Sequence, residues 1–97
     1  MVKHIVMFKL AGTAEERQQV ANKFKEALLQ LPEKIDVLQD MEVGINENPN
    51  EDWDLVLTAI VPTMADVAKY ANHSAHLAAA ALLAGHKESR ACCDYEF

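Results

Sequence analysis

The chain of 97 residues has the size of one domain, residues 1–97, and 51% of its residues are hydrophobic, so a packed core is expected. Its net charge is −6 and its nine Lys and Arg residues are scattered along the chain. Nucleic acid is therefore not expected as a partner, because phosphates require clustered cations. The longest uncharged apolar stretch, Leu77 to Gly85, is about half of the roughly 20 residues that a membrane span requires, so we expect a cytoplasmic protein outside the membrane.

Alternating residues predict a first strand over Val2 to Leu10, with apolar side chains on both faces. A helix is predicted from Ala14, because Thr13 and the acidic residues that follow it form a capping box. Pro32 is expected to end this helix, because proline disfavours helical backbone in the residue before it. The apolar stripe of the helix recurs at spacings of three and four residues and consists of Val20, Phe24, Ala27, Leu28 and Leu31.

The rest of the chain predicts two strands, an interrupted helical region and a last strand. The strands span Val37 to Ile45, Trp53 to Val61 and Arg90 to Phe97, and the turn between the first two is rich in Asn and Pro. Helical residues follow Pro62-Thr63 and are interrupted at Asn72-His73-Ser74. Ser74 is expected to cap a further helix over Ala75 to Ala84, which Gly85 would end.

The order β-α-β-β-α-β predicts an α+β fold of the ferredoxin-like class, with an antiparallel sheet and helices on one face. Two helices cover only one face of a sheet, yet Ile5, Met7, Val56 and Ile60 make the other face apolar as well. A second copy of the same chain is the simplest cover for that face, so we expect a homodimer.

Tyr70, His73 and His76 are three residues apart and lie close to one face if the helix continues across the break. A neutral His76 and the phenol of Tyr70 would form an acid–base pair, able to take a proton from carbon and to stabilise the oxyanion that develops. Surface histidines beside a core tyrosine would give the same pattern. No metal or cofactor is expected, because two histidines without a carboxylate or cysteine at ligand spacing make an incomplete site.

His4 shares a strand face with Val6 and Phe8, where an imidazole needs a hydrogen-bond partner. A core histidine with a satisfied ring is the ordinary interpretation of such a residue. The alternative is a pocket on which His4, Tyr70 and His76 converge, because the second helix must cover the same side of the sheet. The apolar lining expected for that pocket is Val6, Phe8, Phe24, Leu28 and Leu55.

Three segments, Val2 to Lys9, Trp53 to Val61 and Tyr70 to His76, resemble the stress-responsive A/B barrel (Dabb) family. The resemblance covers nearly the whole chain, and the histidine on the first strand with the Tyr-x-x-His-x-x-His run makes it fairly specific. It implies a dimeric α+β barrel. This implication agrees with the argument from the two apolar faces of the sheet.

Most members of that family have no assigned reaction, and the best understood one is the plant olivetolic acid cyclase. That enzyme closes a linear polyketide by aldol condensation without a cofactor. The resemblance implies that His76 acts as the base, that Tyr70 stabilises or protonates the enolate, and that His4 lines the pocket. His73 also matches, and the resemblance implies a structural part for it next to the ligand.

The chain departs from the cyclase at Leu55, where the cyclase has a histidine, and at Ser74, where proline is usual. The residues Leu77 to Ala80 are also smaller than the lining of the cyclase. A different substrate is therefore expected. Three functions remain open at this point: an enzyme acting on a small carbonyl compound, a non-catalytic stress-response or ligand-binding dimer, and a cofactor-independent oxygenase. Fold analogy does not choose among them.

Overall fold

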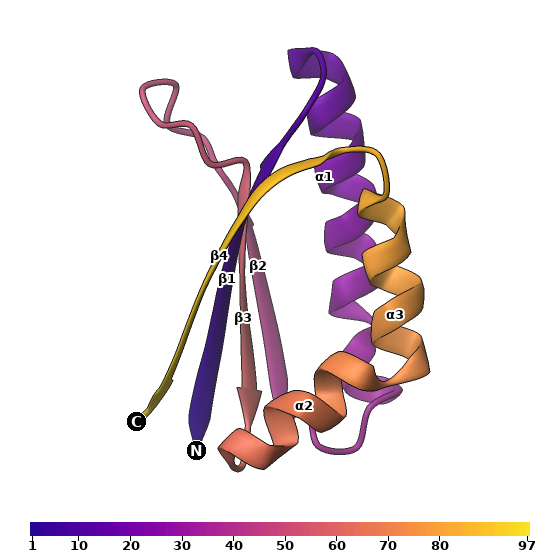
Figure 1. Cartoon of the computed structure of the whole chain (residues 1–97), viewed down its shortest axis with the longest axis vertical. Helices are drawn as coiled ribbons and strands as arrows, with labels where there is room; N and C mark the ends of the chain where they lie inside the picture. Colours follow the sequence, from indigo (N-terminus) through magenta and orange to yellow (C-terminus); the bar gives the residue numbers. More distant parts are fainter.

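A computed structural model describes residues 1–97 and shows a four-stranded antiparallel sheet with its helices on one face (Figure 1). The strand order is β2-β3-β1-β4. This architecture confirms the predicted ferredoxin-like α+β fold. The elements in chain order are β1 (Val2–Leu10), α1 (Ala14–Leu29), the 3₁₀ helix η1 (Leu31–Glu33), β2 (Asp40–Ile45), β3 (Leu55–Val61), α2 (Met64–Asn72), α3 (Ser74–Ala80), the 3₁₀ helix η2 (Ala81–Leu83) and β4 (Lys87–Glu96).

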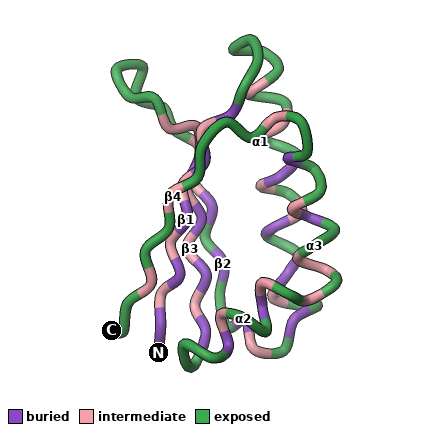
Figure 2. The backbone as a smooth tube through the Cα atoms, in the orientation of Figure 1, coloured by how far each residue is buried: buried purple, intermediate pink, exposed green.

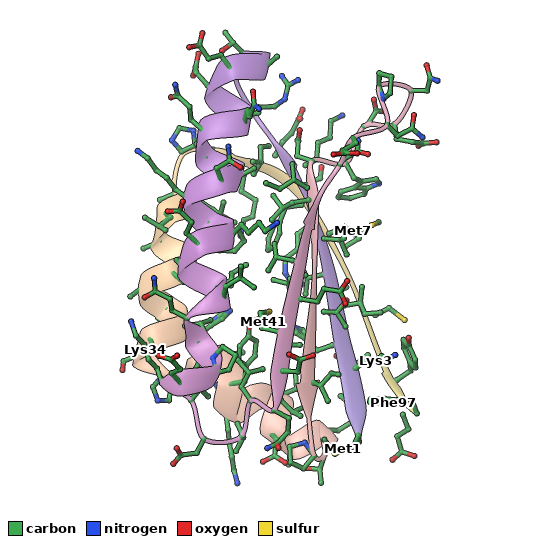
Figure 3. All side chains as sticks on the ribbon, turned by 180° about the vertical axis from the view of Figure 1, so that it is seen from behind. Met1, Lys3, Met7, Lys34, Met41 and Phe97 are labelled. Atoms are coloured by element: carbon green, nitrogen blue, oxygen red, sulfur yellow. The ribbon has the colours of Figure 1, made fainter.

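The two faces of the sheet differ in burial as the alternation predicts. In β1 and β3 every second residue is buried beneath the helices, and the residues between them are partly exposed (Figure 2). Met7 and Lys3 of β1 point away from the helices, as does Phe97 at the end of the chain (Figure 3). The Nζ atom of Lys3 lies 4.5 Å from the centre of the Phe97 ring. The helix-free face is therefore largely apolar and is rimmed by charge.

Helix α1 packs its apolar stripe onto the sheet, mainly over β2. Thr13 caps the helix, because its hydroxyl accepts the backbone N–H of Glu16 at 3.1 Å. Phe24 and Leu28 are fully buried, and the Phe24 ring meets the Phe8 ring edge-on with 5.5 Å between the centroids. Helix α1 therefore covers the β2 side of the sheet, and α2 and α3 lie over the β4 side.

Several boundaries differ from those expected from sequence. Helix α1 ends at Leu29, and Pro32 lies within η1, where its fixed φ fits a tight helical turn. Residues 37–39 belong to the turn before β2, so β2 begins at Asp40. In β3 the pairing begins at Leu55, and β4 pairs with β1 from Lys87. At β2 and β3 the alternating composition starts before the ladder, whereas at β4 the ladder starts three residues before the expected strand.

Helices α2 and α3 begin at two different caps, and the second of them forms the break between the helices. Thr63 and Asp66 form a complete capping box at the start of α2. The cap of α3 is His73, whose Nδ1 accepts the backbone N–H of Ala75 at 3.0 Å. Ser74, which was expected to be the cap, is the first residue of the helix. An imidazole nitrogen fills the position that a hydroxyl or carboxylate usually takes at a helix start.

Strand β4 is an edge strand paired with β1, and it places Asp94 opposite His4 and Cys92 opposite Val6. Both cysteines are free and exposed. The chain ends meet, because the N–H of Phe97 donates to the carbonyl oxygen of Met1 at 3.1 Å. None of the helices is long and apolar enough to span a membrane.

Candidate functional site

A cavity of about 340 Å³ lies between the helix-covered face of β1 and β4 and the helices α2 and α3. Ten of its fifteen lining residues are hydrophobic, with Tyr70 and Cys92 counted among them although each also carries a polar group. Its polar lining comes from four elements and consists of His4, Tyr70, His76, Lys87, Arg90, Cys92 and Asp94. Apolar walls with a few convergent polar groups are typical of small-molecule sites.

Tyr70 is fully buried, and its hydroxyl has no hydrogen-bond partner in the protein. Burial raises the pKa of the Tyr70 phenol well above its ordinary value of 10.0, so the group keeps its proton at neutral pH. An unpartnered buried hydroxyl costs about 1–3 kcal/mol. Such a group is unusual in a native core and needs an explanation.

His76 lies beside Tyr70, with 4.6 Å between the ring centroids and a tilt of 57°. Its Nδ1 donates to the carbonyl oxygen of Ala71 at 2.8 Å, because a carbonyl only accepts. In the neutral ring, Nε2 is therefore the nitrogen that can take a proton. Burial lowers the pKa of His76 below 6.5, and the charges of His4 and Arg90 lower it further, against the opposing effect of the bond to Ala71.

His4 completes the group of rings, because it meets Tyr70 edge-on with 5.8 Å between the centroids. Its Nδ1 lies 2.5 Å from Oδ1 of Asp94, across the ladder that joins β1 to β4. The sulfur of Cys92 lies 3.6 Å from both atoms. Desolvation and the Asp94 carboxylate raise the pKa of the Cys92 thiol above 9.0. The thiol therefore stays protonated at neutral pH and is a poor nucleophile.

His4, Cys92 and Asp94 are also the residues that could hold a metal ion, since their ligand atoms lie within 4.8 Å of one another. Two ligands at about 2.0–2.1 Å from a tetrahedral zinc ion are separated by roughly 3.3 Å. The His4 nitrogen and the Asp94 oxygen are closer than that. A metal would have to push this pair apart, whereas a hydrogen bond accounts for the observed arrangement directly.

The cavity brings together most of the residues singled out in the sequence. His4, Val6, Phe8, Phe24, Tyr70 and His76 all line it. Leu28 is fully buried in the core and does not line the cavity, and the residue of β3 that does is Leu57. Leu55 lies two residues earlier on the same strand and borders a groove of about 600 Å³ with Met7 and Trp53. His73 is turned to its own helix, where it serves as the cap of α3.

Four polar lining residues were not singled out in the sequence, and all four are on β4: Lys87, Arg90, Cys92 and Asp94. The last strand was identified by its apolar alternation from Ala91 to Phe97, which marks the opposite face. The signal that could have found Arg90, Cys92 and Asp94 is the other half of the alternation, the even-numbered positions of the strand. Their place beside the cavity follows only from the pairing of β4 with β1, because this pairing sets Asp94 opposite His4.

The family model of the stress responsive A/B barrel domain matches residues 2–97. The chain belongs to the stress-responsive A/B barrel (Dabb) family. This confirms the resemblance stated for the first strand and the Tyr-x-x-His-x-x-His run. No curated protein matches the chain.

Solved structures give a second comparison. A dimeric protein of unknown function with a ferredoxin-like fold, from Bacteroides fragilis, is 51% identical with a TM-score of 0.96, covering 99% of this chain and 95% of its own. A Dabb family protein from Mesorhizobium loti is 19% identical with a TM-score of 0.73 and coverages of 99% and 95%. An antibiotic biosynthesis monooxygenase is 12% identical with a TM-score of 0.78 and coverages of 100% and 98%. The last two show a shared fold alone.

Proposed function

We propose that this Dabb protein binds a small carbonyl compound, such as a polyketide-like β-dicarbonyl, in the cavity between β4 and α3, and that Tyr70 and His76 act on it as an acid–base pair. One observation carries the proposal. The hydroxyl of Tyr70 is buried without a partner next to His76. A ligand carbonyl oxygen would accept from this hydroxyl and remove the cost of leaving it unpaired.

The chemistry follows from the protonation states of the two groups. A β-dicarbonyl has an acidic carbon between its carbonyls, and the neutral Nε2 of His76 can remove a proton from that carbon. The enolate oxygen that forms would accept a hydrogen bond from the Tyr70 phenol, which remains protonated because it is buried. The enolate carbon then attacks a second carbonyl of the same molecule and forms a carbon–carbon bond. His76 returns its proton to the alkoxide that this attack forms. Loss of water and enolisation of the remaining carbonyls then give the aromatic ring.

The remaining lining residues support this assignment. Val6, Phe8 and Phe24 supply apolar contact for a hydrocarbon chain. His4 is held by Asp94 and meets the Tyr70 ring edge-on. A His4 ring fixed in this way can orient the tyrosine or contact the ligand. Leu28 and Leu55 would support the wall from behind, and His73 would fix the start of α3 on which His76 sits.

We also propose that the chain works as a homodimer with the helix-free faces packed together. Ile5, Met7, Val56 and Ile60 are only partly buried on that face, and exposed apolar surface is unfavourable by about 25 cal/mol per Å². The groove of about 600 Å³ beside Met7 and Trp53 lies on the same face. The 51% identical protein from Bacteroides fragilis is described as dimeric, which supports the same assembly here.

The catalytic part of the proposal is tested with methyl 3,5,7-trioxooctanoate, which closes between its second and seventh carbons to methyl orsellinate and water. We expect the wild-type protein to speed formation of the aromatic product over the buffer rate. His76→Gln should reduce the enzymatic rate by about 10²-fold or more, since it removes the base. Tyr70→Phe should reduce it by about 10²-fold, since it removes the oxyanion donor.

His86→Gln is the matched control, because His86 lies outside the cavity and its loss also removes one imidazole. This variant should retain the wild-type rate. A wild-type rate equal to that of buffer, with the probe nevertheless bound, would contradict catalysis and favour the ligand-binding alternative.

A further inference from the structure

We propose that the ligand of this cavity is an organic anion, whose carboxylate is held by Arg90 and Lys87 while its carbonyl group meets Tyr70 and His76. This inference rests on the proposed function and narrows its substrate class to keto acids. It assigns a binding role to two β4 residues that carry no role in the acid–base chemistry.

Strand β4 presents its polar side chains to the cavity in a row. Arg90, Cys92 and Asp94 alternate along the strand and pair with Phe8, Val6 and His4 of β1, which face the helices. Arg90 therefore lies on the helix-covered side of the sheet, where it lines the cavity together with Lys87. Both residues are exposed, so their charged groups can meet a ligand that enters from solvent.

The charges around the cavity favour an anion at this end. Neither Lys87 nor Arg90 forms an ion pair in the structure. Asp94 is the carboxylate of the lining, and it is engaged by Nδ1 of His4. Asp94 lies four positions along the strand from Arg90, which corresponds to about 13 Å between their Cα atoms. A protein with a net charge of −6 thus has two unpaired cations at one end of an apolar cavity.

The chemistry of the two cations suits a carboxylate. A guanidinium can donate two parallel N–H bonds to the two carboxylate oxygens, and an ammonium adds a third donor. Arg90 is also close enough to His76 for its charge to lower the pKa of that imidazole. An anion bound at Arg90 would offset this charge. Binding should therefore raise the pKa of His76 and make it a stronger base when the ligand is present.

The test compares 4-oxooctanoate with 4-oxooctanamide, a neutral probe of nearly the same shape, by isothermal titration at low ionic strength. We expect the acid to bind at least about tenfold more tightly than the amide, because charge-assisted hydrogen bonds are roughly twice as strong as neutral ones. Arg90→Gln should weaken binding of the acid by about tenfold and leave the amide unchanged. Lys87→Gln should have a smaller effect of the same kind. Added salt should weaken binding of the acid alone.

Lys23→Gln is the matched control, because Lys23 is an exposed residue of α1 outside the cavity and its loss also removes one positive charge. This variant should bind both probes as the wild type does. Equal affinity for acid and amide would overturn the anion assignment while leaving a carbonyl site in place. Failure of both probes to bind would overturn the proposed function and this inference together.

Discussion

Tyr70 and His76 are in ring contact, 4.6 Å between centroids, although they belong to different helices separated by the break at His73. The contact exists because α2 ends at Asn72 and α3 starts in a new direction. In an uninterrupted helix, six residues correspond to about 600° of rotation, which would leave the two side chains about 120° apart around the axis. The spacing of three residues alone therefore does not bring the two rings together, contrary to the expectation from the sequence. The break is therefore what creates the acid–base pair.

Tyr70→Phe should weaken ligand binding without lowering the stability of the fold. The variant loses a buried hydroxyl that has no partner, so the free energy of unfolding should stay the same or rise by about 1 kcal/mol. Binding of 4-oxooctanamide should weaken, because the donor to its ketone is lost. Urea denaturation and titration of the same samples measure both quantities. A clear loss of stability would show that the hydroxyl already has a partner within the fold.

His76 should titrate below pH 6.5, and its titration should affect stability. Its pKa is lower in the folded chain than in the unfolded chain, so the unfolded chain binds more protons as pH falls through 6.5. The contribution of His76 is thus fully present above pH 6.5 and is lost as pH falls toward its folded pKa. Denaturation of the wild type and of His76→Gln between pH 7.5 and 5.5 measures it. We expect a weaker pH dependence in the variant, and an unchanged one would contradict the lowered pKa.

The helix-free face should control assembly. Met7→Glu places a carboxylate in the middle of the proposed dimer interface, and a buried unpaired charge is strongly unfavourable. Light scattering should find the wild type dimeric at micromolar concentration, and the variant monomeric or aggregated. Gln19→Glu adds the same charge to an exposed position of α1 and should leave the dimer intact. A monomeric wild type would contradict the proposed homodimer.

His73 should stabilise the start of α3 as its cap. His73→Ala removes the acceptor of the Ala75 N–H and should cost about 1 kcal/mol of unfolding free energy. Ser74→Ala, one residue later, leaves that bond intact and should change stability by less than about 0.5 kcal/mol. Urea denaturation of the two variants compares them directly. A larger loss of stability in Ser74→Ala than in His73→Ala would show that Ser74 is the cap.

The faces of the sheet could be predicted from sequence, because alternation in β1 and β3 places Val6 and Leu57 on one side and Met7 on the other, and this periodicity does not depend on the rest of the fold. The partner of His4 could not. Asp94 is 90 residues away in sequence, and the register of two distant strands decides which residue faces the histidine.

The same limit explains the smaller differences in the site. Leu28 shares a helix stripe with Phe24, but α1 packs mainly over β2, so only Phe24 reaches the cavity on the β4 side. Leu55 and Leu57 share a face of β3, and which of them borders the cavity depends on where α2 and α3 cross the strand. His73 and Ser74 are both plausible caps by residue type or position, and the backbone angle of the break selects the histidine.

The central claim is that Tyr70 and His76 meet a ligand within one cavity, and intermolecular nuclear Overhauser effects test it most directly. With 4-oxooctanoate bound, we predict contacts from the ligand chain to the rings of both Tyr70 and His76, and to Phe24 on the opposite wall. Contacts confined to Met7 and Trp53, in the groove on the helix-free face, would contradict the account.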